Sequence, residues 1–253
     1  MISTEMLKKL GNQYQMAVYP NVVREYFQHI FLSELYKLPK AEKLFFKGGT
    51  AFRIVYGSPR FSEDLDFSLL DMPQNEIKSF VEELFIQVLA EMAQMGLQVE
   101  LGEKSGVTSG GYFGIANFKM PEYQPVSVEI NISTRKGKKI AGEADSIAND
   151  FTPPYTIIHL PQVEMVEEKI FGALLTRKKP RDFYDLYMIM RKGMLTAEQK
   201  KRLVEVRDII ISFARQISFK SELEEFLPAN QQGIIKDFSA TLERELNNQL
   251  GGA

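Results

Sequence analysis

Two carboxylates, Asp64 and Asp66, are separated by a single residue in a segment, residues 64–70, that is typical of a β-strand. Side chains two residues apart on a strand point to the same face, so both carboxylates are expected at one spot. Paired carboxylates hold hard cations such as Mg²⁺, which in turn bind phosphates. The pair therefore predicts a metal site that serves phosphate chemistry.

A glycine pair, Gly48-Gly49, lies shortly before these carboxylates. It follows an apolar segment, residues 44–46, that indicates a buried strand, and it precedes a short predicted helix at residues 50–56. Glycines let a backbone approach a phosphate closely, and a helix N-terminus favours anions. A glycine pair is usually only a turn, and Asp-x-Asp is often a solvated strand end or a helix cap. The order strand, glycine pair, helix and acidic strand is more specific, and it predicts a nucleoside-triphosphate site.

Two stretches of the sequence resemble a known family. The run FFKGGTAFRIVYGSPRFSEDLDFSLL is similar to the first motif of the AbiEii/AbiGii-type nucleotidyltransferases, members of the DNA polymerase β-like superfamily. The run MVEEKIFGALLTRKKPRDFYDLYMI resembles the later motifs, a Glu-Lys pair on one helix and an Arg-Asp-x-x-Asp on the next. The resemblance spans residues 45–189. Many relatives have Gly-Ser in place of Gly48-Gly49, so this chain would hold phosphate through backbone N–H groups or Thr50.

The resemblance implies an enzyme that moves an NMP from an NTP to an acceptor hydroxyl and releases pyrophosphate. It implies Mg²⁺ as the cofactor, with Mn²⁺ as the alternative, held by Asp64, Asp66 and Glu129. Lys169 would act with these three as a catalytic residue by reaching the triphosphate. The expected nucleotide-binding residues are Lys47, Gly48, Gly49, Thr50, Arg60, Ser62, Asp182 and Asp185.

Several of these residues also have ordinary explanations. Glu129 lies on a strand that alternates apolar and polar side chains, so it is either an exposed strand residue or the third carboxylate; we favour the second because Glu is disfavoured in strands. Asp182 and Asp185 are one helical turn apart and share a face. They could form a plain surface salt bridge, with Arg181 pairing with Asp185. Lys169 would pass for a surface lysine without the resemblance.

The pattern of elements predicts an α+β protein. An amphipathic helix at residues 76–95 follows the motif region, and Gly96 is its expected stop. Three strands, separated by Gly-, Ser- and Pro-rich segments, suggest antiparallel hairpins; they are residues 97–101, 112–120 and 126–133. A further strand is expected at residues 155–160. After it the pattern becomes helical, with a capping-box signature at Thr196-x-x-Gln199.

We therefore expect two domains. Residues 1–160 would form a polymerase-β-like nucleotidyltransferase domain, with N-terminal helices and a mixed sheet flanked by helices. Residues 161–253 would form a C-terminal helical bundle, with helices expected up to residue 213, at 222–227 and at 234–246.

Composition narrows the chemistry. The 253 residues include no cysteine and two histidines, so thiolate, disulfide and His-rich metal sites are excluded. His159 follows two isoleucines and is expected to be structural. No apolar run reaches membrane-spanning length and the N-terminus lacks the apolar core of a signal peptide, which favours a cytoplasmic protein without a membrane partner. The net charge of −2 argues against bulk coating of nucleic acid.

The acceptor is open. The resemblance implies tRNA or another RNA end for some members, while aminoglycoside-like small molecules and protein hydroxyls are alternatives. Two basic clusters would serve RNA or be solvated loops; they are Arg135, Lys136, Lys138, Lys139 and Arg177, Lys178, Lys179, Arg181. Many members of the family are toxins of toxin–antitoxin or phage-defence systems, which implies a cognate antitoxin. A relative that binds nucleotide without catalysis is the remaining alternative, and three converging acids argue against it.

Overall fold

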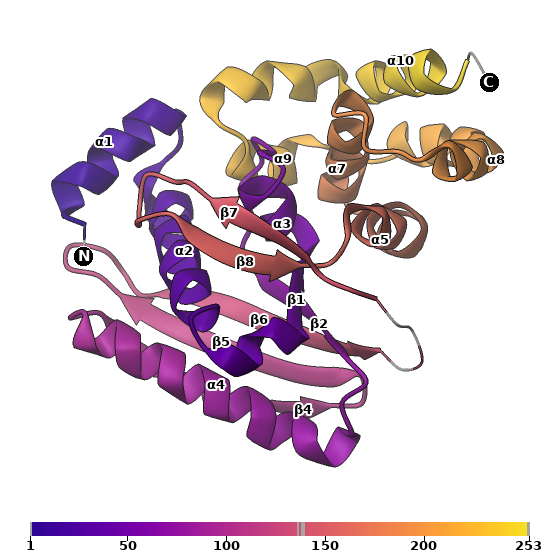
Figure 1. Cartoon of the computed structure of the whole chain (residues 1–253). Coiled ribbons are helices and arrows are strands. Elements are labelled where there is room, and N and C mark those ends of the chain that lie inside the picture. The colour runs from indigo at the N-terminus through magenta and orange to yellow at the C-terminus, as the bar shows by residue number, and fades with distance from the viewer. Residues whose placement is uncertain (1, 136, 138–139, 252–253) are drawn as a thin grey trace. The chain divides into compact units, whose positions relative to one another are not determined.

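The computed structural model describes residues 2–135, 137 and 140–251, and it is an α+β protein (Figure 1). The chain divides into two compact units. Unit 1 comprises the chain up to Gly57 together with Phe61–Leu160, and unit 2 comprises Ser58–Arg60 together with the chain from Pro161 onward. None of the described helices is both long enough and apolar enough to cross a membrane.

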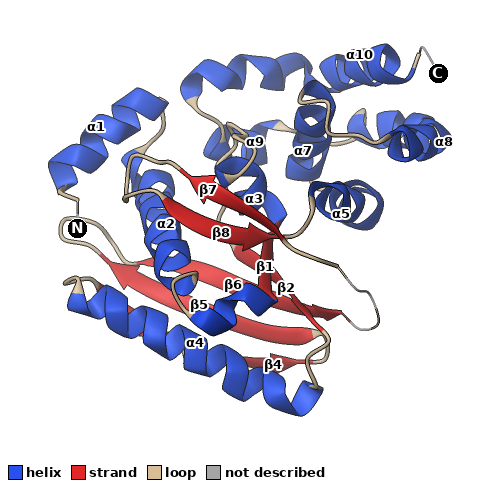
Figure 2. Ribbon diagram, in the orientation of Figure 1, coloured by secondary structure: helices blue, strands red, loops and turns tan. Residues whose placement is uncertain are grey.

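Unit 1 is built on a mixed eight-stranded sheet in the order β3-β5-β6-β2-β1-β8-β7, with β4 paired to β5 (Figure 2). Two pairings are parallel, β2 with β6 and β1 with β8, and the others are antiparallel. The strands are β1 (Leu44–Lys47), β2 (Leu65–Leu70), β3 (Gln98–Leu101), β4 (Gly106–Thr108), β5 (Gly111–Lys119), β6 (Val126–Arg135), β7 (Glu143–Ile147) and β8 (Tyr155–His159).

Two long helices pack together against this sheet, α2 on β6 and β8 and α4 on β3 and β5. Both present apolar faces to it: Phe27 of α2 stacks on Phe118 at 4.5 Å between ring centroids, and Phe85 of α4 meets Tyr112 edge to face. The helical segments of unit 1 are α1 (Thr4–Tyr14), η1 (Val18–Val22), α2 (Val23–Leu35), η2 (Pro39–Lys43), α3 (Gly48–Ile54) and α4 (Gln74–Gln94).

The described residues of unit 2 from Pro161 onward form helices and connecting turns. The predicted capping box is present at the start of α8, where Thr196 and Gln199 exchange side-chain and backbone hydrogen bonds. The segments are α5 (Gln162–Glu167), η3 (Glu168–Leu174), α6 (Leu175–Arg177), α7 (Pro180–Arg191), α8 (Ala197–Ala214), α9 (Lys220–Phe226), η4 (Ala229–Asp237) and α10 (Phe238–Leu250).

The structure differs from the sequence-based expectations at several boundaries. Helix α3 begins at Gly48, so the glycine pair lies in the first turn of the helix and not ahead of it. Strand β2 begins at Leu65, which leaves Asp64 just before the strand. Two short strands, β4 and β7, were not predicted, because β4 has three residues in a Gly/Ser-rich segment and β7 is largely exposed. The helix predicted at residues 234–246 is a 3-10 segment followed by α10 from Phe238.

Candidate functional site

The register of the central strands places three polar side chains side by side. Lys47 on β1 lies opposite Asp66 on β2, and Asp66 lies beside Asn131 on β6. Their neighbours Phe46, Phe67 and Ile132 alternate to the other face and are buried there in the core. Because side chains in register on adjacent strands share a face, these three residues form a polar row on the face opposite the core.

Asp66 lies against the backbone of Gly48, the first residue of the glycine pair. Gly48 has a positive φ of 81°, and a Cβ added to it would lie 2.1 Å from Asp66 Oδ2. No residue with a side chain fits in that space, so glycine is required both for the backbone angle and for the approach of the carboxylate. Helix α3 has only seven residues, so its dipole is short and the glycine backbone itself is the feature that suits a phosphate.

Lys47 sits at the edge of the polar row and is half-buried. Its Nζ donates a hydrogen bond to Ser133 Oγ at 2.7 Å. Burial and, to a smaller extent, the nearby Arg135 charge lower the pKa of Lys47 to about 8, although Asp66 opposes the shift. The ammonium is therefore held near a carboxylate in a poorly solvated place, where it would interact strongly with an added anion.

These residues line a cavity of about 360 Å³ in unit 1. Lys47, Asp66, Asn131 and Ser133 contribute its polar lining. Asn131 and Ser133 were not among the predicted site residues, although the alternation of β6 already put both on the same face as Glu129. The missing information was the parallel register of β6 with β2, which sets Asn131 beside Asp66. That pairing joins strands far apart in sequence and has no local signal.

Asp64 and Glu129, the other two predicted metal ligands, are not in register with Asp66 in the sheet. Among the described residues no group of three or more histidine, aspartate or glutamate side chains is placed to hold a metal ion. Glu129 is exposed on β6, two residues before Asn131. The hydroxyl of Thr50 is buried and donates to the carbonyl oxygen of Asp64, which ties α3 to the start of β2. The assignment of Asp64, Asp66 and Glu129 as metal ligands stays a prediction.

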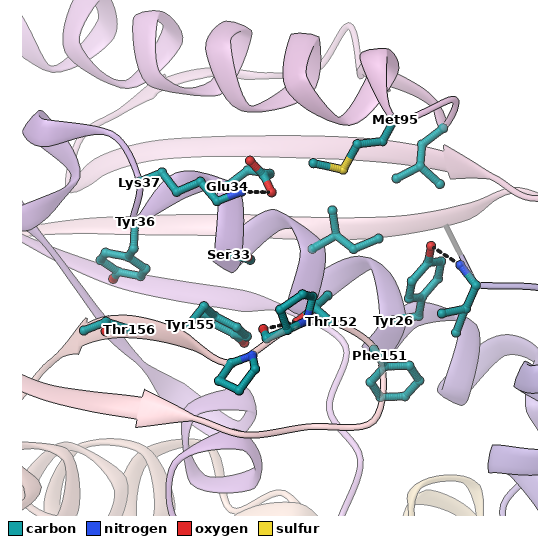
Figure 3. Close-up of a pocket in the computed structure, with 15 residues that line it drawn as sticks. Tyr26, Ser33, Glu34, Tyr36, Lys37, Met95, Phe151, Thr152, Tyr155 and Thr156 are labelled. Carbon is teal, nitrogen blue, oxygen red and sulfur yellow. Dashed lines mark hydrogen bonds and ion pairs between the residues drawn. The ribbon is translucent and has the colours of Figure 1, made fainter.

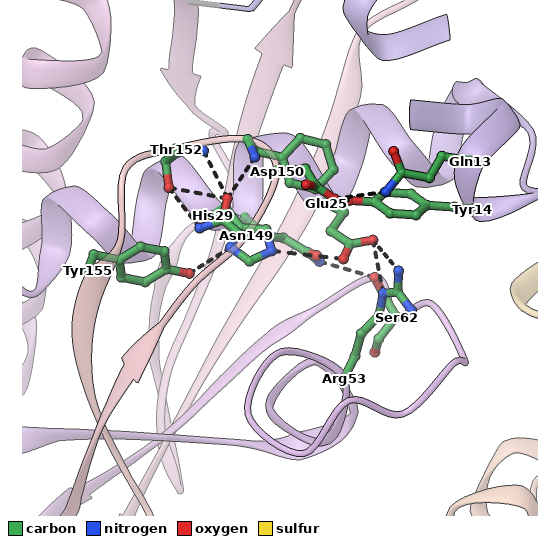
Figure 4. A network of polar contacts seen from close by, with 12 residues as sticks. Gln13, Tyr14, Glu25, His29, Arg53, Ser62, Asn149, Asp150, Thr152 and Tyr155 are labelled. Carbon is green, nitrogen blue, oxygen red and sulfur yellow. Dashed lines mark hydrogen bonds and ion pairs between the residues drawn. The ribbon is translucent and has the colours of Figure 1, made fainter. Parts of the chain in front are cut away.

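A buried polar network braces α3 from the side of α2 (Figure 4). Arg53 on α3 donates from Nε to Glu25 Oε2 at 2.9 Å, and its guanidinium lies 3.5 Å from the centre of the Phe61 ring. His29 places Nε2 3.8 Å from Glu25 Oε1 and shares a 2.8 Å hydrogen bond with the Tyr155 hydroxyl. Burial would raise the pKa of Glu25, but the Arg53 charge and His29 outweigh it and keep that pKa below its usual range.

A buried charge cluster in unit 2 contains four of the predicted site residues. Three come from the second motif, Lys169, Asp182 and Asp185, and Arg60 comes from the loop before β2. Arg60 donates from Nε and Nη2 to the two oxygens of Asp185, both at 2.9 Å. Lys169 Nζ lies 2.8 Å from Asp185 and 3.7 Å from Asp182, and Arg177 forms two hydrogen bonds with Asp182. Asp182 is fully buried and Asp185 is 2% exposed.

Asp182 and Asp185 are therefore buried and do not form the surface salt bridge that was one interpretation of their spacing. Arg181, the partner considered for Asp185, pairs with Glu222 at 3.3 Å. Burial would raise the pKa of Asp185, but the Arg60 and Lys169 charges outweigh it and lower that pKa. A carboxylate with a lowered folded pKa stabilises the fold above its unfolded pKa of about 4 and loses this effect as the pH falls through the folded value. The predicted contacts of Lys169, Asp182 and Asp185 with nucleotide stay predictions.

The remaining predicted features are placed as follows. The carbonyl oxygen of Ser62 accepts a hydrogen bond from Gln28 Nε2 at 3.1 Å, which helps to order the loop before β2. The ammonium of Lys178 lies 3.6 Å from the centre of the Phe213 ring, and Lys179 is exposed. Lys136, Lys138 and Lys139 of the first basic cluster lie outside the described residues. His159 is buried and structural as expected, with Nε2 2.9 Å from Asp145 Oδ2.

A family description matches the chain over both units. The family is the nucleotidyl transferase AbiEii toxin, type IV toxin–antitoxin system, and the match covers residues 30–248. The chain belongs to this family. The protein is therefore an AbiEii-type nucleotidyltransferase, and the toxin–antitoxin description indicates an antitoxin partner. The resemblance of the two motif stretches is confirmed.

Solved structures with the same fold support the architecture. One is described as a candidate nucleotidyltransferase from H. pylori; it has 16% sequence identity and a TM-score of 0.64, over 92% of this chain and 96% of that chain. Another, JHP933 from Helicobacter pylori, has 17% identity and a TM-score of 0.59 over the same shares. At these identities the likeness shows the fold alone. No match is found among curated proteins.

We expect Gly48→Ala to destabilise the AbiEii-type protein by about 1–3 kcal/mol beyond the cost of the positive φ alone, because the new methyl group overlaps Asp66. Gly96→Ala is the matched control, since Gly96 has φ 85° and a Cβ there meets nothing within 4 Å. The control should cost only the backbone strain of about 1–2 kcal/mol. Urea denaturation measures both; equal losses would contradict the close approach.

We expect Arg60→Met to lower the free energy of unfolding by about 3 kcal/mol or more, because it strips a buried partner from Asp185. Arg215→Met is the control: Arg215 also pairs with a carboxylate, that of Glu243, but its side chain is 62% exposed, so the loss should stay below about 1 kcal/mol. Thermal and urea denaturation at pH 7 give both values. A small loss for Arg60→Met would mean that the buried pair does not hold unit 2 together.

Proposed function

We propose that this nucleotidyltransferase binds the triphosphate of an NTP at the junction of β1, α3 and β2 and transfers the NMP to an acceptor hydroxyl. The observation that supports this assignment is the carboxylate of Asp66 against the bare backbone of Gly48, beside the half-buried Lys47. A carboxylate suits a metal ion, while the glycine backbone and the lysine suit phosphate oxygens. The 360 Å³ cavity on this face provides room for part of the nucleotide.

Mg²⁺ is the proposed cofactor, and Mn²⁺ the alternative. The donor set agrees with a hard cation, because Asp64 and Asp66 offer carboxylate oxygens and Asn131 beside Asp66 offers an amide oxygen. When bound, such ions neutralise phosphate charge and align the displacement at the α-phosphorus. Glu129 is the weakest member of the proposed set, since it is exposed and lies two residues away from the partner of Asp66.

The protein's own groups would act on the two ends of the reacting bond. The backbone at Gly48 and Gly49 and the Lys47 ammonium would hold the phosphate oxygens. Glu129 would accept the proton of the acceptor hydroxyl as its oxygen bonds to the α-phosphorus. The bond from that phosphorus to the bridging oxygen breaks, and pyrophosphate leaves. Ser62 and Thr50 act in this proposal by ordering the backbone around the carboxylates, since the Thr50 hydroxyl is bonded to Asp64.

Lys169, Asp182 and Asp185 are proposed nucleotide-binding residues on grounds of the family motif alone. Their side chains are paired with each other and with Arg60 in the structure. Lys169 would have to exchange an aspartate for a phosphate oxygen, which is feasible because both are anionic acceptors. Arg60 is buried with Asp185, so its proposed role is to order the loop before β2 and not to bind phosphate.

RNA, in particular a tRNA end, is the proposed acceptor, and the protein would act as the toxin of its toxin–antitoxin pair. Small-molecule or protein hydroxyls are the alternative acceptors. Transfer of radiolabel from each α-labelled NTP into total tRNA, total protein and aminoglycosides separates these cases. Label in tRNA supports the proposal, label in another acceptor corrects it, and no transfer with any NTP favours a non-catalytic nucleotide-binding protein.

We expect Asp66→Asn to lower the transfer rate by about 10²-fold or more while the protein stays folded, because it removes a metal-holding charge worth several kcal/mol in the transition state. Glu122→Gln is the control, since Glu122 is exposed and pairs with Lys8 at the surface. Single-turnover transfer with Mg²⁺ and a melting curve are measured for both. Normal turnover by Asp66→Asn would disprove the metal-site assignment.

If the acceptor is RNA, replacing Lys178 and Lys179 by Ala should weaken its binding and flatten the dependence on salt. Each lost phosphate contact reduces the slope of log affinity against log salt by about 0.7 on single strands. A Lys200 and Lys201 double variant removes the same charge from α8 and should leave the slope unchanged. Fluorescence anisotropy with labelled tRNA between low and physiological salt gives the slopes, and identical slopes for both variants would count against the cluster as an RNA contact.

A further inference from the structure

Unit 1 contains a second, larger cavity of about 640 Å³, away from the polar row of the sheet (Figure 3). It lies between α2, the turn that joins α4 to β3, and the segment that leads into β8. Its lining shares no residue with the 360 Å³ cavity beside Asp66. Its volume falls within the range of small-molecule sites, which are concave and mostly apolar with a few polar groups that fix orientation.

Most of the cavity is a hydrophobic sleeve with aromatic walls. Tyr26 of α2 and Phe151 and Tyr155 of the β8 segment contribute aromatic rings to the lining, as Figure 3 shows. The aliphatic lining residues include Ile30, Met95 and Leu97. The polar tips of the tyrosines are already engaged: Tyr26 accepts from the backbone of Ile2, and Tyr155 is bonded to His29. These rings therefore offer their faces and edges to a ligand, and both suit an apolar group. The ring face also attracts a cation.

A single carboxylate marks one end of the sleeve. Glu34 lines the cavity, and its side chain is only 7% exposed. Lys37 supplies its hydrogen bond at 2.6 Å, from a side chain that is itself 61% exposed. A carboxylate has room for about four hydrogen bonds, and among the described residues no other donor reaches this one. The buried acid is thus poorly satisfied by the protein, and its one partner is a flexible surface lysine.

A second polar group lies along the same wall. Ser33, one residue before Glu34, is 9% exposed and lines the cavity. The hydroxyl of Ser33 and the carboxylate of Glu34 are neighbours in the lining of the cavity, so both are placed to meet a donor group of a ligand.

We propose that this cavity is a binding site for a small hydrophobic amine, whose protonated nitrogen pairs with Glu34 and whose apolar body fills the sleeve between Tyr26, Phe151 and Tyr155. Charge complementarity selects the class: the cavity presents one buried anionic group, and its basic neighbour Lys37 extends to solvent. A carboxylate ligand would be repelled by Glu34, and a neutral alcohol would not compete with the exposed ammonium of Lys37 for the carboxylate. The site is independent of the transfer reaction proposed above.

The test uses three probes of one shape on the full chain: 4-phenylbutylamine, 4-phenylbutanol and 5-phenylpentanoate, each titrated by isothermal calorimetry at pH 7. The amine should bind saturably and at least about tenfold more tightly than the alcohol, since a charge-assisted hydrogen bond is roughly twice as strong as a neutral one. The carboxylate should bind most weakly. No saturable binding of the amine, or equal binding of the amine and either analogue, overturns the proposal.

Variants locate the site. Glu34→Gln should remove the preference for the amine over the alcohol, and Thr156→Trp, on the exposed rim, should weaken both by filling the mouth. Glu83→Gln is the control, because Glu83 forms a similar pair with Lys40 outside the cavity, and it should change nothing. Lys37→Ala frees the carboxylate and should tighten amine binding, which keeps the proposal testable if Glu34→Gln does not fold. The proposal is contradicted if Glu34→Gln binds the amine with wild-type affinity. It is also contradicted if Lys37→Ala binds the amine more weakly, or if Thr156→Trp has no effect.

Discussion

The contact between the Asp66 carboxylate and the backbone of Gly48 is the constraint on which the candidate site depends. A carboxylate oxygen occupies the space that a side chain at residue 48 would need. The chain can therefore turn from β1 into α3 only with glycine at this position, and β2 must pair with β1 in the one register that sets Asp66 beside Lys47. The start of α3 and the placement of the Asp66 and Lys47 charges therefore meet at this single close approach.

Local sequence signals were sufficient for the elements that carry the motifs. The apolar run before Gly48, the alternation along β6 and the capping box of α8 each reflect one element and its solvent exposure, so each was predictable. The position of Asn131 beside Asp66 was not, because it depends on a parallel pairing between strands separated by more than fifty residues. For the same reason Glu129 was preferred on chemical type, although the register brings a different residue next to Asp66.

The charged residues of the second motif show a different limit of sequence reasoning. Asp182 and Asp185 have the spacing of a solvated helix face, and their burial follows only from Arg60, Lys169 and Arg177 arriving from other segments. Buried ions of this kind are tolerated because each is paired and hydrogen-bonded. The local sequence around residue 182 does not distinguish an exposed aspartate from a buried one. The same residue type occurs whether water or a guanidinium contacts the carboxylate.

The assignment of Ser58–Arg60 to unit 2 has a consequence for the way the protein can be dissected. The chain passes between the units three times, after Gly57, after Arg60 and after Leu160. A fragment cut at Leu160 would keep the guanidinium of Arg60 and lose Asp185, while the complementary fragment would keep Asp185 with Lys169 as its remaining base. The first piece would therefore carry a guanidinium that has lost its buried carboxylate, so a single cut at Leu160 does not separate the two units cleanly.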